Sequence, residues 1–283
     1  MTKAPLRVAL DQGTGDNGDP ASALTRLTER VRAAAAAGAH LLIGPEMSLT
    51  GYNIGEATAR SAEPADGPLF EAVAGIAAAT GVAIVYGFPE RDGERVYNTV
   101  QLVDGHGRSL ACYRKTHLFG NLDRRVFTPG EQVVVQAELG EHLVGLLICY
   151  DVEFPEVVRA HALAGTELLV VPTALMAPDT GVATLMVPAR AMENQLHLAY
   201  VNRCDREGDL DYVGLSTLVA PDGTELLRAG AGEALLVGDT DPVAARASLE
   251  HLSYLDDRRP ELYGPLLGRA SPYQHDSIRR RGR

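Results

Sequence analysis

A cysteine near the middle of the chain, Cys149, closes an apolar segment in a position where it could act as a nucleophile. The segment over residues 144–149 is expected to form a buried strand, and Pro155 opens a helix only a few residues later. A tight turn from strand to helix can raise a nucleophile above the edge of a sheet, and strand ends are where the sites of α/β proteins lie. An isolated cysteine is also commonly a small buried core residue, so this segment alone leaves both interpretations open.

A catalytic thiol needs a base or a neighbouring cation, because an unperturbed cysteine titrates near pH ~8.5. One candidate base is a histidine, as in cysteine proteases, and the chain offers His117, His161 and His197 for this role. None of these histidines lies within the local signature of a cysteine protease, so the sequence favours ordinary structural or surface histidines at all three positions.

A carboxylate base supported by a lysine is the second candidate. Glu46 follows the short apolar segment 40–43, and Lys115 follows the segment 109–113, so both would stand just past strand ends. A loop glutamate or lysine is usually just solvated, which makes each segment weak evidence by itself. The chain has only two lysines, Lys3 and Lys115, and all its other fixed positive charges are arginines. Lys115 is therefore an exception, at a position where a compact ammonium group would matter.

The segments around these residues alternate in the manner of an α/β fold. Strands and helices follow one another at residues 6–10, 21–38, 40–43, 69–80 and 82–88, and again at 144–149, 155–164, 167–171, 183–197 and 198–202. Paired strands with turn residues between them are expected at 96–103 with 109–113, and at 213–220 with 224–227.

Apolar strands occur in both halves, and the helices of each half can cover only one outer face. This pattern predicts two mixed sheets packed together with helices outside, a four-layer α-β-β-α sandwich. Neither a linker nor a repeat interrupts the sequence, so we expect a single domain over residues 1–283. Its core would cover about residues 6–263 and its C-terminal tail residues 264–283, with the less regular segment 242–283 as a surface arm.

Three blocks, in order along the chain, resemble the signature motifs of the nitrilase superfamily of carbon–nitrogen hydrolases. They are Pro-Glu-x-x-x-Thr-Gly-Tyr around Glu46, Tyr-Arg-Lys-Thr-His-Leu-Phe around Lys115 and Cys-Tyr-Asp-x-Glu-Phe-Pro-Glu at Cys149. Further matches at residues 127–130, 190–194, 201–203, 214–216 and 221–223 extend the resemblance over about residues 6–263.

The resemblance implies an α-β-β-α sandwich, usually a homodimer formed through its helical face, with a Glu-Lys-Cys triad. Cys149 would be the nucleophile, Glu46 the general base, and Lys115 the group that stabilises the tetrahedral intermediate. The backbone N–H of Tyr150 is the second candidate donor to the oxyanion. Neither a metal nor an organic cofactor is implied, because these side chains supply base, nucleophile and electrostatic stabilisation.

One position departs from the family pattern. Members usually carry a second glutamate about eight residues after the lysine, where this chain has Asp123. A side chain one methylene shorter could still orient Lys115 or the substrate amide if its loop lies closer. In the alternative interpretation, Asp123 only pairs with Arg124 or Arg125 at the surface.

The residues after the nucleophile favour an amidase-like branch of the family. Nitrilases proper typically show Cys-Trp-Glu, whereas this chain has Cys-Tyr-Asp and contains no tryptophan, which disfavours a nitrile substrate. We expect an amidase that hydrolyses linear carboxamides through a cysteine thioester, with an N-carbamoyl amide hydrolase as the alternative and a non-catalytic binding protein as a third possibility. By their position relative to the motifs, the expected pocket residues are Tyr52, Phe119, Tyr150, Thr173 and Ala174.

Composition limits the partners and the compartment. With 37 acidic and 26 basic residues the net charge is −11, which argues against a nucleic-acid or anionic-membrane partner, and the arginine-rich segment 279–283 is expected to be a frayed terminus. Three cysteines without a short CxxC spacing favour reduced thiols over disulfides. The first residues lack the apolar core of a signal peptide, and no apolar run approaches ~18 residues. We therefore expect a soluble cytoplasmic enzyme whose partners are a small-molecule amide and further copies of the chain.

Overall fold

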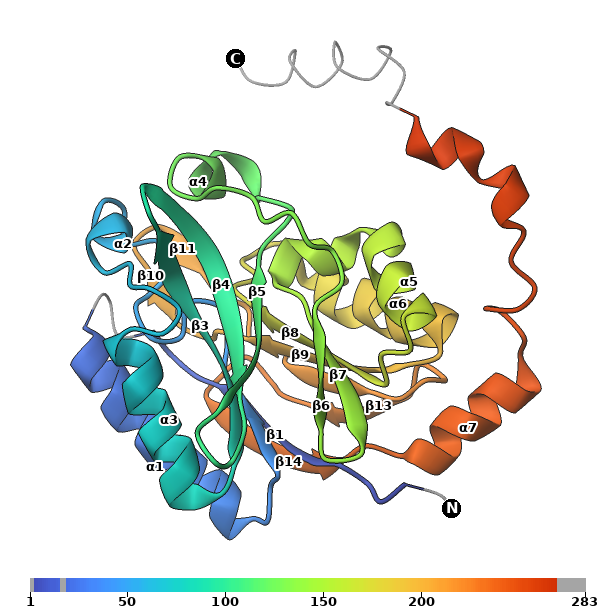
Figure 1. Cartoon of the computed structure of the whole chain (residues 1–283), viewed down its shortest axis with the longest axis horizontal. Coiled ribbons are helices and arrows are strands. Elements are labelled where there is room, and N and C mark those ends of the chain that lie inside the picture. The colour runs from blue at the N-terminus through green and yellow to red at the C-terminus, as the bar shows by residue number, and fades with distance from the viewer. Residues whose placement is uncertain (1–2, 16–18, 269–283) are drawn as a thin grey trace.

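Two six-stranded sheets pack face to face at the centre of the molecule, and helices cover their outer faces (Figure 1). The computed structural model describes residues 3–15 and 19–268 of the chain. The first sheet has the strand order β14-β1-β2-β3-β4-β5, formed by β1 Arg7–Gln12, β2 Leu41–Ile43, β3 Ala83–Asp92, β4 Arg95–Val103, β5 Ser109–Arg114 and β14 Ala234–Asp239. The second has the order β13-β12-β9-β8-β7-β6, formed by β6 Gln136–Leu139, β7 His142–Leu146, β8 Leu168–Thr173, β9 His197–Asn202, β12 Thr217–Val219 and β13 Glu225–Arg228. The four-layer sandwich in one domain is confirmed.

Four helices form the outer layers. Helices α1 (Pro20–Ala36) and α3 (Pro68–Thr80) cover the first sheet, while α5 (Pro155–Leu163) and α6 (Val187–Asn194) cover the second (Figure 1). The remaining elements are α2 Ala57–Arg60, α4 Gly120–Arg124, α7 Pro242–His251, the 3-10 turns η1 Cys149–Glu153, η3 Pro260–Leu262 and η4 Gly264–Leu267, the π-helical turn η2 Val182–Met186, and the ribbon of β10 Arg206–Glu207 with β11 Leu210–Asp211. No helix among residues 3–15 and 19–268 is both long and apolar enough to cross a bilayer.

The continuous apolar strands reflect burial on both faces. In β2, Leu41 and Ile43 belong to the core between the two sheets, while Leu42 belongs to the core under α1 and α3. Successive side chains of a strand point to opposite faces, so a strand that is buried on both sides needs apolar residues at every position.

Four loops of interest leave the same edge of the sandwich. Strands β1, β2 and β3 are parallel to one another, and so are β7, β8 and β9. Because β4 is antiparallel to both β3 and β5, β5 runs in the direction of β2. The segments that follow β2, β5, β7 and β8 carry Glu46, Lys115, Cys149 and Ala174. The topology therefore collects residues from distant parts of the sequence at one edge.

Several boundaries differ from the sequence prediction. The strand expected to reach Cys149 ends at Leu146, and the helix expected over 183–197 begins as a π-helical turn and ends at Asn194, because Gln195 adopts a left-handed conformation at φ 53°. The strand expected over 213–220 forms only as Thr217–Val219. Strands β6 and β14 were not predicted, since each is an edge strand of mixed polarity.

The segment expected to be irregular after residue 242 contains the helix α7 and then extends from the body through η3 and η4 (Figure 1). We call residues 252–268 the C-terminal arm. The predicted frayed terminus at 279–283 lies outside the described residues.

A glycine in β3 permits the close approach of the loop that carries Glu46. The backbone N–H of Gly87 donates to the Ser48 hydroxyl at 3.1 Å, and the Leu49 N–H donates to the Gly87 carbonyl at 3.2 Å. A Cβ at Gly87 would come within 2.5 Å of the Met47 backbone nitrogen. Any side chain at this position must therefore displace the loop.

We predict that Gly87→Ala lowers the free energy of unfolding by about 1–3 kcal/mol, the usual cost of overpacking. Urea denaturation of both proteins measures this difference in the free energy of unfolding. The matched control is Gly75→Ala in α3, where a Cβ meets nothing within 4 Å and a helical alanine should raise stability by about 0.5–1 kcal/mol. A Gly87→Ala protein as stable as wild type would show that the loop does not depend on this contact.

Candidate active site

A fully buried lysine lies at the centre of the site. The Lys115 Nζ is 2.8 Å from Glu46 Oε1 and 2.8 Å from Asp123 Oδ2, and all three side chains are 0% exposed. It also lies 5.7 Å from the centroid of the Tyr52 ring. The structure thus brings together three of the residues that the motifs selected, and it pairs one buried cation with two carboxylates.

Glu46 reaches the lysine from the loop after β2. Its backbone N–H donates to the Thr173 carbonyl at 3.3 Å, which ties this loop to the end of β8 in the other sheet. Its Oε1 also accepts from Asn98 Nδ2 at 2.6 Å, whereas its buried Oε2 has no hydrogen-bond partner. One carboxylate oxygen is therefore held in place and the other is available to a reacting group.

Asp123 belongs to the site and not to the surface. It is buried in α4, where its Oδ1 accepts from the Tyr52 hydroxyl at 2.7 Å and its Oδ2 accepts from the Phe119 backbone N–H at 2.8 Å. These contacts rule out the alternative in which Asp123 only pairs with Arg124 or Arg125 at the surface. The short side chain of Asp123 reaches Lys115 because α4 begins directly after Phe119, only a few residues beyond the lysine.

Cys149 stands at a strained turn. Its φ is +47°, in the left-handed region that costs a residue with a side chain about 1–3 kcal/mol. The preceding Ile148 is extended, and the 3-10 turn η1 begins at Cys149 itself. This conformation takes the chain abruptly out of the direction of β7 and leaves the cysteine partly exposed. The predicted turn from strand into helix is present, and it is sharper than the sequence could indicate.

The electrostatics of the site favour a protonated thiol next to a basic carboxylate. Burial raises the pKa of the Cys149 thiol and so does the charge of Glu46, while Lys115, the Thr173 hydroxyl and the Ala174 backbone N–H lower it. Burial also raises the pKa of Glu46, against the effect of Lys115. A carboxylate whose pKa is raised in this way is a better proton acceptor than an ordinary glutamate.

The lysine keeps its proton. Burial lowers the pKa of Lys115, but the neighbouring carboxylates outweigh burial and hold the pKa above its ordinary value. The group is therefore an ammonium ion at neutral pH, able to stabilise a developing negative charge.

Aromatic rings cluster on the segments that follow Lys115 and Cys149. Phe119 and Tyr150 meet edge to face with centroids 5.3 Å apart, and Tyr150 meets Phe154 in the same way at 4.9 Å. His117 stacks on Phe154 at 4.0 Å. We call these four residues the aromatic rim. Of the expected pocket residues, Phe119 and Tyr150 belong to the rim, whereas Tyr52, Thr173 and Ala174 are buried.

The histidines have other partners. His161 is buried and contacts the Thr166 hydroxyl at 3.0 Å, and burial lowers its pKa to about 4. His197 accepts from the Asp241 backbone N–H at 2.9 Å. His117 contacts Asp151 at 2.9 Å. These contacts give the first two histidines structural roles, and they favour the carboxylate as the base.

Sequence reasoning missed the polar residues that support the site from within strands and loops. Asn98 lies in the middle of β4. Its side-chain amide donates to Glu46, and its backbone carbonyl accepts from the Lys115 backbone N–H at 2.8 Å. Glu207 accepts from the backbone N–H groups of Tyr52 and Asn53 and from the Tyr212 hydroxyl. The one available signal was a buried-strand asparagine, which is unusual in an apolar strand.

None of the described residues forms a group of three or more His, Cys, Asp or Glu side chains able to hold a metal ion.

Comparison with known proteins identifies the family. The model of carbon–nitrogen hydrolases matches residues 7–248. The chain belongs to the carbon–nitrogen hydrolase family. This hydrolase is therefore an enzyme that acts on carbon–nitrogen bonds, and the resemblance found in its motifs is confirmed.

Relatives and solved structures are similar over nearly the whole hydrolase. A Pseudomonas protegens protein named "Hydrolase in pqqF 5'region" is 49% identical over 264 residues, covering 92% of each chain. An "(R)-stereoselective amidase" of Pseudomonas sp is 37% identical over 260 residues, covering 92% of this chain and 93% of that protein. A mutant of the Nesterenkonia AN1 amidase, a member of the nitrilase superfamily, has a TM-score of 0.85 and 38% identity, covering 93% of this chain and 97% of its own.

We predict that iodoacetamide alkylates Cys149 much faster than the other two cysteines of the hydrolase at neutral pH. Burial raises the pKa of Cys112 to about 12 and that of Cys204 to about 11, and only Cys149 has the unpartnered oxygen of Glu46 to take its proton. Peptide mass spectrometry over time gives the three rates separately, with Cys112 and Cys204 as internal controls.

The same experiment has a pH dependence with a definite sign. Glu46 accepts a proton only when ionised, so alkylation of Cys149 should slow as the pH falls through the raised pKa of Glu46, above the ordinary glutamate value of 4.5. Glu46→Gln should slow it by about 100-fold at neutral pH, the usual contribution of a general base. Equal rates at all three cysteines would contradict the assignment of Cys149.

Proposed function

We propose that this hydrolase is an amidase that converts linear carboxamides into a carboxylic acid and ammonia, with Glu46, Lys115 and Cys149 as its catalytic triad. The observation that carries the proposal is the buried Lys115 ammonium between two carboxylates, one of which keeps a free oxygen in the electrostatic environment of the Cys149 thiol. The comparisons add support, because a mutant of the amidase from Nesterenkonia sp. AN1 shows covalent addition of the acetamide moiety of fluoroacetamide at the active-site cysteine.

In the first half of the reaction, the Cys149 sulfur attacks the amide carbonyl carbon while Glu46 takes the thiol proton. The carbonyl oxygen becomes an oxyanion, and we assign its stabilisation to the Lys115 ammonium and the Tyr150 backbone N–H. The carbon–nitrogen bond then breaks, Glu46 gives its proton to the leaving nitrogen, and ammonia departs from a thioester. In the second half, Glu46 takes a proton from water as the water oxygen attacks the thioester carbon. The carbon–sulfur bond then breaks, and Glu46 returns the proton to the leaving thiolate, which releases the carboxylic acid and restores the thiol.

Asp123 takes the part of the second family glutamate in this proposal. Its contacts with the Tyr52 hydroxyl and the Phe119 N–H fix it in place, so it can hold the Lys115 ammonium at a constant position. We assign it to orientation of Lys115 rather than to proton transfer, because Glu46 has the unpartnered oxygen.

The charges near the rim favour neutral monoamides as substrates. Glu153 lies four residues after Cys149, and its pKa is raised by burial and by the nearby charge of Asp179. A substrate with its own carboxylate would meet these acidic groups, whereas the aromatic rim offers apolar contact to an acyl chain. We therefore propose small or medium aliphatic or arylaliphatic amides, with N-carbamoyl amines as the alternative class.

Ammonia release from a panel of propionamide, glutamine, an N-carbamoyl amine and a nitrile tests the proposal. We expect turnover to be fastest with propionamide, and Cys149→Ala to lower kcat by at least about 10⁴-fold, as loss of a catalytic nucleophile does. Cys204→Ala is the control, because the Cys204 thiol donates to the Gln12 carbonyl at 3.8 Å and not to a group of the proposed triad, and the variant should keep wild-type turnover. Faster release from the N-carbamoyl amine would establish the alternative, and activity that survives in Cys149→Ala would refute the nucleophile.

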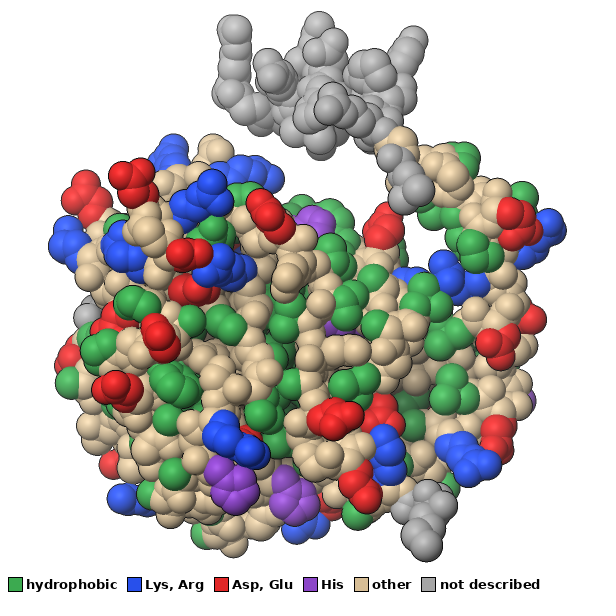
Figure 2. Space-filling model, viewed as in Figure 1, with side chains coloured by type: hydrophobic (Ala, Val, Ile, Leu, Met, Phe, Trp, Pro, Cys, Tyr) green, Lys and Arg blue, Asp and Glu red, His purple; other side chains and the backbone are tan. Residues whose placement is uncertain are grey.

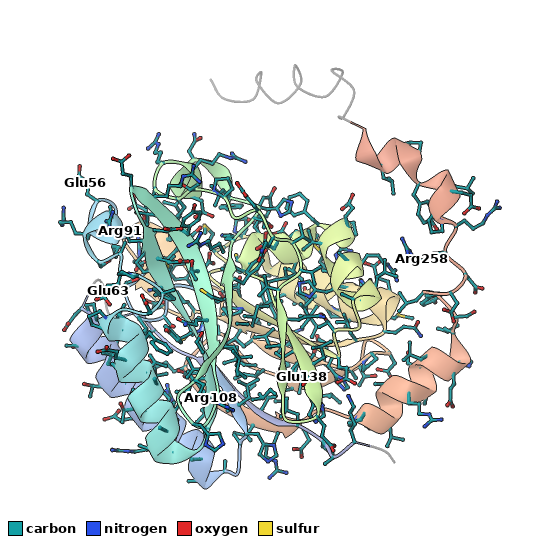
Figure 3. The ribbon with its side chains drawn as sticks, in the orientation of Figure 1. Glu56, Glu63, Arg91, Arg108, Glu138 and Arg258 are labelled. Atoms are coloured by element: carbon teal, nitrogen blue, oxygen red, sulfur yellow. The ribbon has the colours of Figure 1, made fainter. Side chains whose placement is uncertain are left out.

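We also propose that the enzyme is a cytoplasmic homodimer formed through the face of α5 and the C-terminal arm. Exposed apolar side chains gather there, including Leu163 on α5 and Leu262 and Leu266 on the arm, and the arm stands away from the body (Figure 2). Between arm and helix lies a cavity of about 580 Å³, into which Arg258 reaches from the arm (Figure 3). A second copy would cover this apolar surface.

The cytoplasmic location has a separate support. All three cysteines are free, which favours a reducing compartment.

Light scattering of the full chain should give about twice the 30.1 kDa of one chain. Leu163→Arg should reduce the mass to that of a monomer, because it places a charge in the apolar contact, while Leu226→Arg at the exposed edge strand β13 should leave it unchanged. A wild-type protein with the mass of one chain at micromolar concentration would contradict the dimer.

A further inference from the structure

Two residues after Cys149, the side chain of Asp151 lies fully buried between the loops that carry the lysine and the cysteine. Its carboxylate is not among the groups that the proposed reaction uses. A buried carboxylate is costly unless its oxygens accept hydrogen bonds, so the identity of its donors indicates what it does.

The first oxygen of Asp151 binds the chain just after Lys115. Its Oδ1 is 2.9 Å from the Thr116 hydroxyl, 2.9 Å from the His117 backbone N–H and 2.9 Å from His117 Nδ1. Thr116 and His117 immediately follow the lysine, so this oxygen fixes the outgoing side of the Lys115 backbone.

The second oxygen binds both the chain before Lys115 and the chain before Cys149. The Tyr113 hydroxyl donates to Oδ2 at 2.9 Å, and the Ile148 backbone N–H donates to it at 3.2 Å. Burial and the charge of Asp151 raise the pKa of Tyr113, so the phenol keeps the proton that it donates. One carboxylate therefore binds residues on either side of the lysine and the residue that precedes the nucleophile.

We propose that Asp151 is a positioning residue that fixes the spacing between the Lys115 ammonium and the Cys149 thiol. Lys115 follows β5 of the first sheet and Cys149 follows β7 of the second, so the two catalytic groups stand on different layers of the sandwich. Asp151 joins these layers at the reacting groups, and it also supports the left-handed turn at Cys149 through Ile148. The inference rests on the proposed function and adds a residue that acts through Lys115 and Cys149 without touching the substrate.

The arrangement requires a carboxylate, and an amide of the same shape cannot replace it. In Asp151→Asn, one oxygen becomes an NH₂ group, which cannot accept a hydrogen bond. Either orientation of the amide then places this NH₂ against a backbone N–H, that of His117 in one case and that of Ile148 in the other. One of the two loops must move away, and the distance between ammonium and thiol changes with it.

The test compares kcat and KM for propionamide in Asp151→Asn and in a matched control, with activities corrected for the folded fraction from urea denaturation. We expect kcat to fall by about 100-fold, as displacement of a catalytic group by about 1 Å does. We expect KM to change by less than about threefold, because the hydrogen bonds of the Asp151 carboxylate reach one rim residue, His117, and not the rings of Phe119, Tyr150 and Phe154.

Asp104→Asn is the matched control. Asp104 is likewise buried and accepts from two backbone N–H groups, those of His106 and Arg108, at 2.9 Å each. It lies in the turn between β4 and β5, next to Arg108 at the end of the strand opposite to the site (Figure 3). We expect it to lose stability and to keep kcat within about twofold. An Asp151→Asn protein with wild-type kcat per folded molecule would overturn the inference, as would an equal loss of kcat in both variants.

Two provisions keep the outcomes distinct. If Asp151→Asn does not fold, Tyr113→Phe removes a single donor to Oδ2 and decides the question by the same comparison of kcat with KM. If the wild type releases no ammonia from any amide, the proposed function fails, and the alkylation rate of Cys149 in the same variants then tests the positioning alone: a rate unchanged in Asp151→Asn would refute it.

Discussion

The structure depends on the burial of one positive charge. The Lys115 ammonium has no contact with solvent, and a buried charge of this kind is stable only when opposite charges and hydrogen bonds surround it. Glu46 and Asp123 supply two negative charges to its one positive charge, which leaves an excess of one negative charge in a buried environment. That excess can be relieved by taking up a proton, and Glu46, with its unpartnered oxygen, is the group placed to do so. In the proposed mechanism, the arrangement that stabilises the lysine therefore also prepares Glu46 to accept the thiol proton.

The fold supplies this arrangement by bringing together strand ends that are remote in sequence. Glu46 and Lys115 come from the first sheet and Cys149 from the second, so their geometry depends on how the two sheets pack. Contacts across the junction fix that packing near the site: the Glu46 N–H donates to the Thr173 carbonyl, and Asp151 binds both loops. The strained φ of Cys149 is part of this geometry, because the chain must turn away from the direction of β7 within one residue to present the thiol at the site. Strain of this kind persists only where the surroundings determine the conformation more strongly than the residue itself.

The residues that stand next to strand ends could be predicted from the sequence, and those whose role depends on packing could not. Glu46, Lys115 and Cys149 each follow an apolar run within a short motif, so local pattern was enough to select them. Asp123 remained ambiguous, because an acidic residue beside two arginines suits a surface loop equally well until the position of α4 is known. Nothing in the sequence indicated the partners of Asn98 and Asp151, because those partners are distant in the chain. Asn98 lies 52 residues from Glu46, and Asp151 lies 38 residues from Tyr113. The edge strands β6 and β14 escaped prediction for a related reason, because they acquire their pairing from neighbours that are distant in sequence.

The charge state of Lys115 tests the central claim most directly, and the composition makes the measurement simple. Because Lys3 and Lys115 are the only lysines, a sample labelled with ¹⁵N-lysine has just two side-chain nitrogen signals, and Lys115→Arg assigns them. NMR spectra recorded across a pH titration then report whether each nitrogen is an ammonium or an amine. The account predicts that the Lys115 nitrogen remains an ammonium at pH ~10.4, where an ordinary lysine has lost half of its protons. A neutral amine at Lys115 in the folded protein at pH 7 would contradict it.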